Sequence, residues 1–178
     1  HGDGRWDPEN LSRFISAYQG TSTLMLGELW AIPIMLRLAL IESLATVSRR
    51  VAIGRSHRNL ADGWADQMEA VAESDPKSLI LVTADMARSV PPLSNSFVSE
   101  MARRLQGRGV ALKLPLTWIE QRLAENGLTL EQMVQTENQQ QAANQTTVSN
   151  CIASLRRLGE LDWREFVEQM SVVHQILL

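Results

Sequence analysis

The sequence of 178 residues has one cysteine, Cys151, and only three histidines. A single cysteine excludes an internal disulfide and a metal site built from several thiolates, and it is typical of a protein in a reducing compartment. The 17 Lys and Arg residues stand against 20 Asp and Glu, so the basic excess needed for broad nucleic-acid binding is missing and no nucleic-acid partner is expected. Hydrophobic residues make up 44% of the chain, which excludes disorder and predicts a globular core.

Familiar catalytic motifs are missing as well. The sequence has no glycine-rich phosphate loop, no His-Glu-x-x-His zinc motif and no Gly-x-Ser-x-Gly nucleophile elbow. Its histidines, His1, His57 and His174, do not have the spacing of metal ligands. No general base with an orienting partner can be named. We therefore expect no catalytic residue, no metal and no cofactor in this stretch.

Capping residues, prolines and glycines divide the chain into helices. The Asp-Pro pairs at residues 7–8 and 75–76 combine an N-cap with proline at the first helical position, and Thr129 with Gln132 forms a capping box. Alternating strand patterns are nearly missing. The pattern predicts an all-α protein of about seven helices, a bundle or an irregular helical array without significant sheet. The expected helical stretches are 8–19, 24–47, 58–73, 75–88, 94–106, 115–126, 129–158 and a last one from 162 on.

Residues 24–47 form the most apolar stretch of the sequence. Pro33 lies inside it, so the helix either kinks there or starts nearby. Glu28, Arg37 and Glu42 interrupt the stretch, and each is costly at the centre of a bilayer. We therefore expect a buried helix of a globular protein and no transmembrane segment.

One expected helix is rich in amides. Eight of the sixteen residues over 135–150 are Asn or Gln, and no formal charge occurs over 138–155. At 3.6 residues per turn, Glu137, Gln141 and Asn144 fall on the apolar face that should meet other helices. Two interpretations stay open. These groups form a hydrogen-bond network between helices, or they line a polar cleft that holds sugar hydroxyls.

A second group of candidate residues lies in the apolar stretch. Glu28 beside Trp30 could bind a polar ligand against an aromatic wall, with Arg37 downstream. The alternative is that Glu28 pairs with Arg37 or with a neighbouring helix. The candidate contact residues of the whole chain are therefore Glu28, Trp30, Arg37, Glu137, Gln141 and Asn144.

Several strings in the sequence are long or specific in composition: HGD at 1–3, DP at 7–8, GELWAIPIMLR at 27–37, QAANQ at 141–145, VSN through SLR at 148–156, and DWREF at 162–166. Together these strings resemble those of bacterial cyclic β-1,2-glucan synthases. The resemblance covers most of the chain and is weak over about 55–112. The sequence departs from the family pattern at 21–25 and at His174.

The resemblance implies a single helical domain over residues 1–178, excised from a much larger chain, as the apolar run at 172–178 without a C-cap glycine also indicates. It implies a place before the membrane-embedded glycosyltransferase part, on the cytoplasmic face of the bacterial inner membrane. Enzymes of that family use UDP-glucose to build a β-1,2-glucan and release it as a ring, and their catalytic residues lie outside this stretch.

The function that follows is an accessory domain, not catalytic alone, that supports the transferase or guides the glucan through the six candidate residues. The other domains of the parent enzyme and β-1,2-glucan itself are its candidate partners. The alternative is a purely structural or protein-docking helical module without a ligand.

Overall fold

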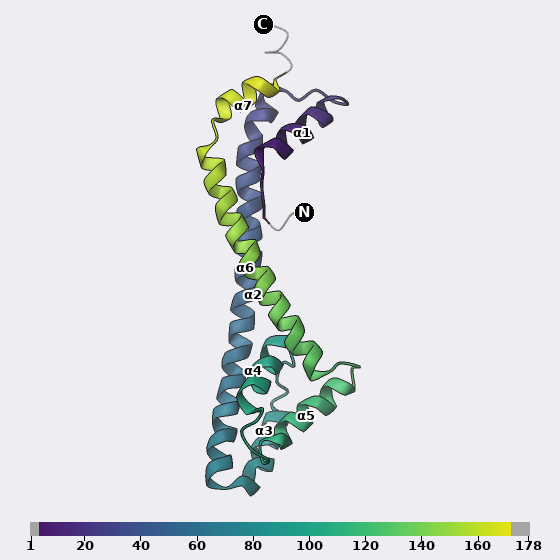
Figure 1. Cartoon of the computed structure of the whole chain (residues 1–178), viewed down its shortest axis with the longest axis vertical. Helices are drawn as coiled ribbons and strands as arrows, with labels where there is room; N and C mark the ends of the chain where they lie inside the picture. The colour runs from purple at the N-terminus through teal and green to yellow at the C-terminus, as the bar shows by residue number, and fades with distance from the viewer. Residues whose placement is uncertain (1–3, 172–178) are drawn as a thin grey trace. The chain divides into compact units, whose positions relative to one another are not determined.

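The structure, a computed structural model, describes residues 4–171, and these residues form helices without any strand. The predicted all-α fold is confirmed (Figure 1). His1, His174 and the apolar run at 172–178 lie outside the described residues. The α-helices are α1 (Pro8–Gln19), α2 (Leu26–Ser74), α3 (Leu79–Arg88), α4 (Asn95–Leu105), α5 (Lys113–Ala124), α6 (Leu130–Glu160) and α7 (Trp163–Met170), with a short 3-10 helix at Pro76–Ser78 before α3.

Most helices begin at the caps that the sequence marks. The Asp7 carboxylate accepts from the backbone N–H of Glu9 at the start of α1. Thr129 and Gln132 form the predicted reciprocal capping box before α6, with N···O distances of 3.1 and 3.2 Å. Asp75, Ser94 and Asp162 likewise accept backbone N–H bonds at their helix starts. These side chains satisfy backbone donors that the first turn of a helix leaves unpaired.

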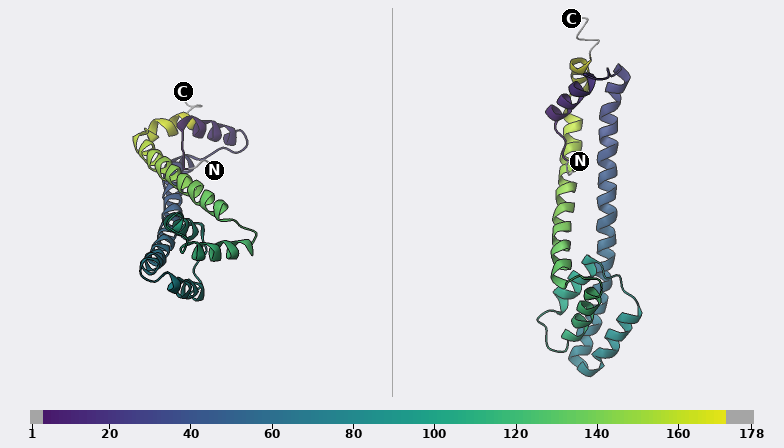
Figure 2. Two further views of the ribbon diagram at one scale, coloured as in Figure 1. Left: turned by 60° about the horizontal axis from the view of Figure 1, so that its bottom comes forward. Right: turned by 90° about the vertical axis from the view of Figure 1, so that its right-hand side faces the viewer.

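The helix α2 differs from the sequence-based expectation. Two helices, over 24–47 and 58–73, were expected, but one helix runs unbroken from Leu26 to Ser74 (Figure 2). Pro33 lies within the helix, so one backbone hydrogen bond is missing there without ending it. Gly54, which lies between the two expected helices, is in close contact with another helix. A Cβ atom at this position would lie 3.0 Å from the Ser96 hydroxyl of α4. The glycine therefore serves packing between helices rather than a turn.

Tertiary contacts group the chain into two compact units, and α2 and α6 pass through both. Unit 1 takes the described residues up to Arg49 and from Ala143 on, and unit 2 takes Arg50–Ala142. The predicted single domain over 1–178 stays a prediction.

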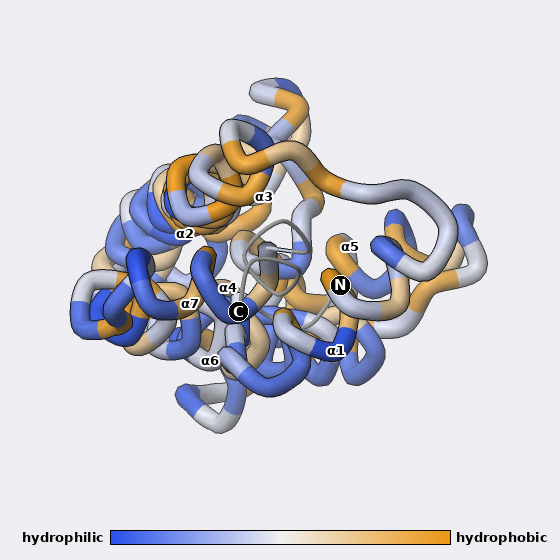
Figure 3. The backbone as a smooth tube through the Cα atoms, turned by 90° about the horizontal axis from the view of Figure 1, so that it is seen from above, coloured by the Kyte–Doolittle hydropathy of each residue, from blue (hydrophilic) through white to orange (hydrophobic). Residues whose placement is uncertain are grey.

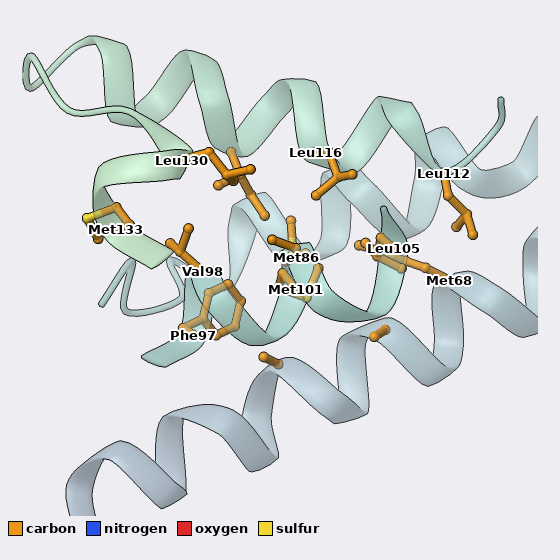
Figure 4. Close-up of a cluster of buried hydrophobic side chains, with 14 of the residues drawn as sticks. Met68, Met86, Phe97, Val98, Met101, Leu105, Leu112, Leu116, Leu130 and Met133 are labelled. Carbon is orange, nitrogen blue, oxygen red and sulfur yellow. The ribbon is translucent and has the colours of Figure 1, made fainter. Parts of the chain in front are cut away.

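Unit 2 has the largest hydrophobic core, shown in Figure 4. It is built from the second half of α2 with α3, α4, α5 and the start of α6. On α4, Phe97, Met101 and Leu105 recur at intervals of four, and each is at most 1% exposed. Such spacing places them on one face of the helix, which explains why α4 is buried along its length.

Unit 1 has two smaller cores around its aromatic residues. The rings of Trp6 and Trp163 lie 6.1 Å apart, and those of Trp163 and Phe166 lie 5.3 Å apart edge to face. Ser154 on α6 accepts from the Trp6 backbone N–H at 2.9 Å and donates to the Gly4 carbonyl at 2.8 Å. These bonds hold the segment before α1 against α6, and a single hydroxyl serves both.

Candidate functional site

Glu137 on α6 is the most buried charged group among the predicted site residues, with 5% of its surface exposed. Its carboxylate accepts from Arg58 Nη1 on α2, from Ser96 Oγ on α4 and from Gln141 Nε2, one turn further along α6, each at 2.9 Å. The predicted position of Glu137 on the packed face of α6 is therefore confirmed. Three donors around one carboxylate satisfy a buried charge that would otherwise be costly.

This arrangement joins three helices of unit 2. Next to it, a ring nitrogen of His57 lies 2.8 Å from the hydroxyl of Ser94, the N-cap of α4. The two links tie neighbouring positions of α2 to the first turn of α4. A carboxylate that already accepts three hydrogen bonds, one of them from an arginine, is poorly placed to act as a general base or to bind a ligand. The geometry is that of a structural network.

Gln141 and Asn144 differ in exposure. Gln141 is exposed, and its amide donates to Glu137, so these two predicted residues are brought together. Asn144 is 8% exposed and has an interaction partner in the structure. Asn144 is grouped with unit 1, whereas Gln141 and Glu137 belong to unit 2.

The three candidates on the first half of α2 do not form a cluster of free polar groups. Glu28 accepts from the backbone N–H of Met25 at 2.7 Å, so its carboxylate caps its own helix. Arg37 donates to the carbonyl of Leu158 on α6 at 3.2 Å. A Glu28–Arg37 ion pair, one of the alternatives that the sequence left open, does not occur within the described residues. Trp30 is 43% exposed and is the candidate whose ring remains open to a partner.

The Leu158 carbonyl is a shared acceptor near the end of α6. It accepts from Arg37 and also from Trp163 Nε1, which lies 2.8 Å away. The two donors compensate for the carbonyls that the last turn of a helix leaves without partners. Arg37 therefore links α2 to the end of α6.

A second charged network was not anticipated from the sequence. Arg104 on α4 donates to Asp62 at 3.0 Å, Asp66 at 2.5 Å and Glu69 at 3.0 Å, all on α2 of unit 2. Hydrogen bonds to Glu69 and then Asp66 raise the pKa of Arg104 above its usual value. Acidic residues at 62, 66 and 69 recur at intervals of four and three, so they lie on one helix face. That spacing is the feature of the sequence from which an acidic face of α2 could have been predicted.

Unit 2 also has two shallow hollows beside the loop between α4 and α5. One has a volume of about 460 Å³, and Lys113, Thr117 and Glu120 are among its lining residues. The other, of about 210 Å³, borders Glu69, Glu73 and Arg108. None of the six predicted residues lines either hollow. Within residues 4–171, no cluster of three or more His, Cys, Asp or Glu side chains is placed to hold a metal ion.

Among the described helices, α2 alone is long and apolar enough to cross a membrane by length and composition. Its most apolar window of 18 residues has a mean hydropathy of 1.6, but only 17% of that window is buried. Figure 3 shows hydrophobic residues along α2. The expectation of a buried helix is therefore wrong for most of this stretch, because α2 is buried along one side only, at positions that include Leu29, Leu40 and Val47.

Fold and geometry together define an all-α protein whose polar candidate residues are mostly engaged in its own packing. No family model matches the sequence. The chain is similar to the cyclic beta-(1,2)-glucan synthase NdvB of Rhizobium meliloti (strain 1021), with 29% identity over 169 residues. The match covers 95% of this chain and 6% of the length of that protein. It confirms the resemblance that the sequence strings indicated.

Proposed function

We propose that the chain is an accessory helical domain of a cyclic β-1,2-glucan synthase that supports the enzyme by docking against its other parts. The observation that carries the proposal is the similarity of 95% of the chain to a small part of one such synthase. A stretch that corresponds to 6% of the length of such a synthase leaves most of that protein for the catalytic parts, which is compatible with a supporting role for this chain.

The contacts favour docking over guidance of the glucan. Guidance requires free hydroxyl-binding groups on a surface, whereas Glu137, Glu28 and Arg37 all bind groups of the chain itself. Exposed large apolar side chains gather on the first part of α2, from Leu26 to Ile41. Apolar surface of this kind is typical of an interface with protein or with a membrane, and the charged residues Arg37 and Glu42 in or next to this stretch favour protein. As the resemblance implies, the parent enzyme would use UDP-glucose at the cytoplasmic face of the inner membrane.

The activity is tested on the complete gene product. Membranes that contain it are incubated with UDP-glucose, and cyclic β-1,2-glucan is detected by mass spectrometry. We expect the cyclic product, and we expect its loss when the core of unit 2 is disrupted by Met101→Asp, provided that immunoblotting shows equal amounts of protein in the membranes. Absence of cyclic β-1,2-glucan from membranes with the unaltered protein would overturn the proposal.

The glucan-guide version is tested separately with the 178-residue chain. Linear β-1,2-glucan is added at millimolar concentration, and the NMR signals of the backbone amides and of the indole of Trp30 are followed. A docking domain predicts unchanged signals. Concentration-dependent shifts at Trp30 or Gln141 would instead show that these residues bind the glucan.

A further inference from the structure

The first half of α2 exposes a stripe of large apolar side chains. Trp30, Ile34, Leu38 and Ile41 are 43%, 58%, 56% and 53% exposed, and we call these four residues the α2 seam. All four lie in unit 1. They are spaced by four, four and three residues, so they follow one face of the helix over about 17 Å at 1.5 Å per residue.

The seam faces away from a second apolar stripe on the same helix. Leu29, Leu40 and Val47 are at most 8% exposed, and Leu29 and Leu40 belong to the two small cores of unit 1. The first half of α2 therefore has apolar residues on two opposite sides. The side of Leu29 and Leu40 is covered by the rest of the chain, and the side of the α2 seam is exposed. A helix that is apolar all round is typical of a segment buried on all sides, either in a larger protein or in a membrane.

The charges along α2 favour protein over lipid. Arg37 and Glu42 lie on either side of the seam in the middle of the apolar stretch, where a bilayer would have its hydrocarbon centre. Glu42 is exposed, and its carboxylate has no hydrogen-bond or ion-pair partner among residues 4–171. A carboxylate at the border of an apolar seam is suited to pair with a basic side chain of a protein partner.

The spacing of the seam indicates the shape of the partner. Apolar residues at intervals of three and four residues, bordered by charges, are typical of two helices packed lengthwise. Ala45, four residues after Ile41, continues the same face with a small exposed side chain, which allows a second helix to approach closely. The complementary surface is a helix with an apolar stripe and a basic residue beside it.

We infer that the α2 seam is the docking site for an apolar helix of the same synthase polypeptide, with a basic residue of that helix facing Glu42. The inference rests on the proposed function. We assign the partner helix to the same polypeptide because the chain corresponds to only 6% of the length of its relative. Most of such a protein therefore lies outside this stretch.

Photo-crosslinking in the complete gene product tests the inference. A benzophenone amino acid replaces Ile34, membranes from expressing cells are irradiated, and crosslinked peptides are identified by mass spectrometry. We expect a crosslink to a helix of the same polypeptide outside residues 1–178, and Glu42→Arg should reduce its yield several-fold. Gln145, which is exposed on α6, is the control position and should give no crosslink to that helix.

Other crosslinks would overturn the inference. A crosslink between two differently tagged copies would identify a self-association surface, and a lipid adduct would identify a membrane surface. No crosslink at Ile34, with protein present and irradiated, also contradicts docking. Cyclic β-1,2-glucan synthesis is measured in the same membranes before irradiation. If glucan is made but the crosslink is missing, only the inferred docking site is contradicted. If no glucan is made, the proposed function itself is contradicted.

Discussion

The contacts of Glu137 distinguish a ligand-binding group from a member of a hydrogen-bond network between helices. The sequence places it on the apolar face of α6, which is compatible with both interpretations. Its donors Arg58 and Ser96 lie 79 and 41 residues away, so their approach cannot be read from local spacing. Periodicity correctly predicted that Glu137 and Asn144 are buried, and it was wrong for Gln141, which is exposed. Only the packing of α2 and α4 shows that the charge of Glu137 is already paired.

Replacement of Glu137 tests whether the network is structural. Glu137→Leu leaves the Ser96 hydroxyl and the Arg58 guanidinium without their acceptor. We expect the free energy of unfolding to fall by about 1–3 kcal/mol, because a buried polar group without a partner is penalised by that amount. Urea unfolding followed by circular dichroism measures the change.

Gln141→Leu is the matched control for that measurement. The Gln141 side chain is exposed and provides only one of the three hydrogen bonds to Glu137. We expect a loss below about 0.5 kcal/mol, as for most surface substitutions. Equal effects of the two substitutions would contradict a buried network centred on Glu137.

Arg104 gives a second prediction, which depends on salt. Arg104→Met removes hydrogen bonds to Asp62, Asp66 and Glu69 and leaves three acidic groups close together. We expect a loss of about 1–2 kcal/mol in unfolding free energy at low salt, since the carboxylates are partly exposed. The loss should shrink at high salt, because the Debye length falls to about 3 Å at 1 M.

Arg103→Met is the control for this network. Arg103 lies beside Arg104, but its side chain is 66% exposed and its closest partner is Glu100 on its own helix. Its removal should change stability less than removal of Arg104 at every salt concentration. Arg103 also lies 3.9 Å from Asp62 on α2, a longer contact than those of Arg104. A larger effect at Arg103 would therefore contradict the central place of Arg104 in the network.

At the scale of elements, helix starts were more predictable than helix continuity. Asp7, Thr129 and Asp162 mark their helices because capping is a local interaction within three residues. The two expected helices join into α2 through Gly54, whose close approach to Ser96 of α4 is a tertiary contact that no local pattern reveals. The long helix α6, expected over 129–158 and observed over Leu130–Glu160, was predictable because its capping box and its apolar face agree.

Two glycines of α2 in unit 2, Gly54 and Gly63, allow the effects of helix propensity and of close packing on stability to be measured separately. A Cβ atom at Gly63 would meet no other atom within 4 Å, so Gly63→Ala should raise the free energy of unfolding by about 0.5–1 kcal/mol through helix propensity. At Gly54 the added methyl meets the Ser96 hydroxyl at 3.0 Å, so Gly54→Ala should give no such gain. Thermal unfolding of both variants measures the difference, and a gain at Gly54 equal to that at Gly63 would contradict close packing there.

At the scale of the whole molecule, substitutions in the α2 seam should affect function without affecting the stability of the 178-residue chain. Ile34 and Leu38 are more than half exposed, so the double variant Ile34→Asp with Leu38→Asp removes little packing within the 178-residue chain. We expect its melting temperature to stay close to that of the unaltered chain, because surface substitutions change stability little and aspartate in mid-helix has only a modest propensity penalty.

The same double variant should behave differently in the complete gene product. A seam that packs against another helix would receive two carboxylates in an apolar interface, and burial of unpaired charge is strongly unfavourable. We therefore expect cyclic β-1,2-glucan synthesis in membranes to fall at least tenfold, with the amount of protein verified by immunoblotting. The control is Ser149→Asp on the exposed surface of α6, which should leave synthesis unchanged. Full activity of the double variant would show that nothing covers the seam in the working enzyme, because two aspartates can be tolerated at these positions only where water reaches them.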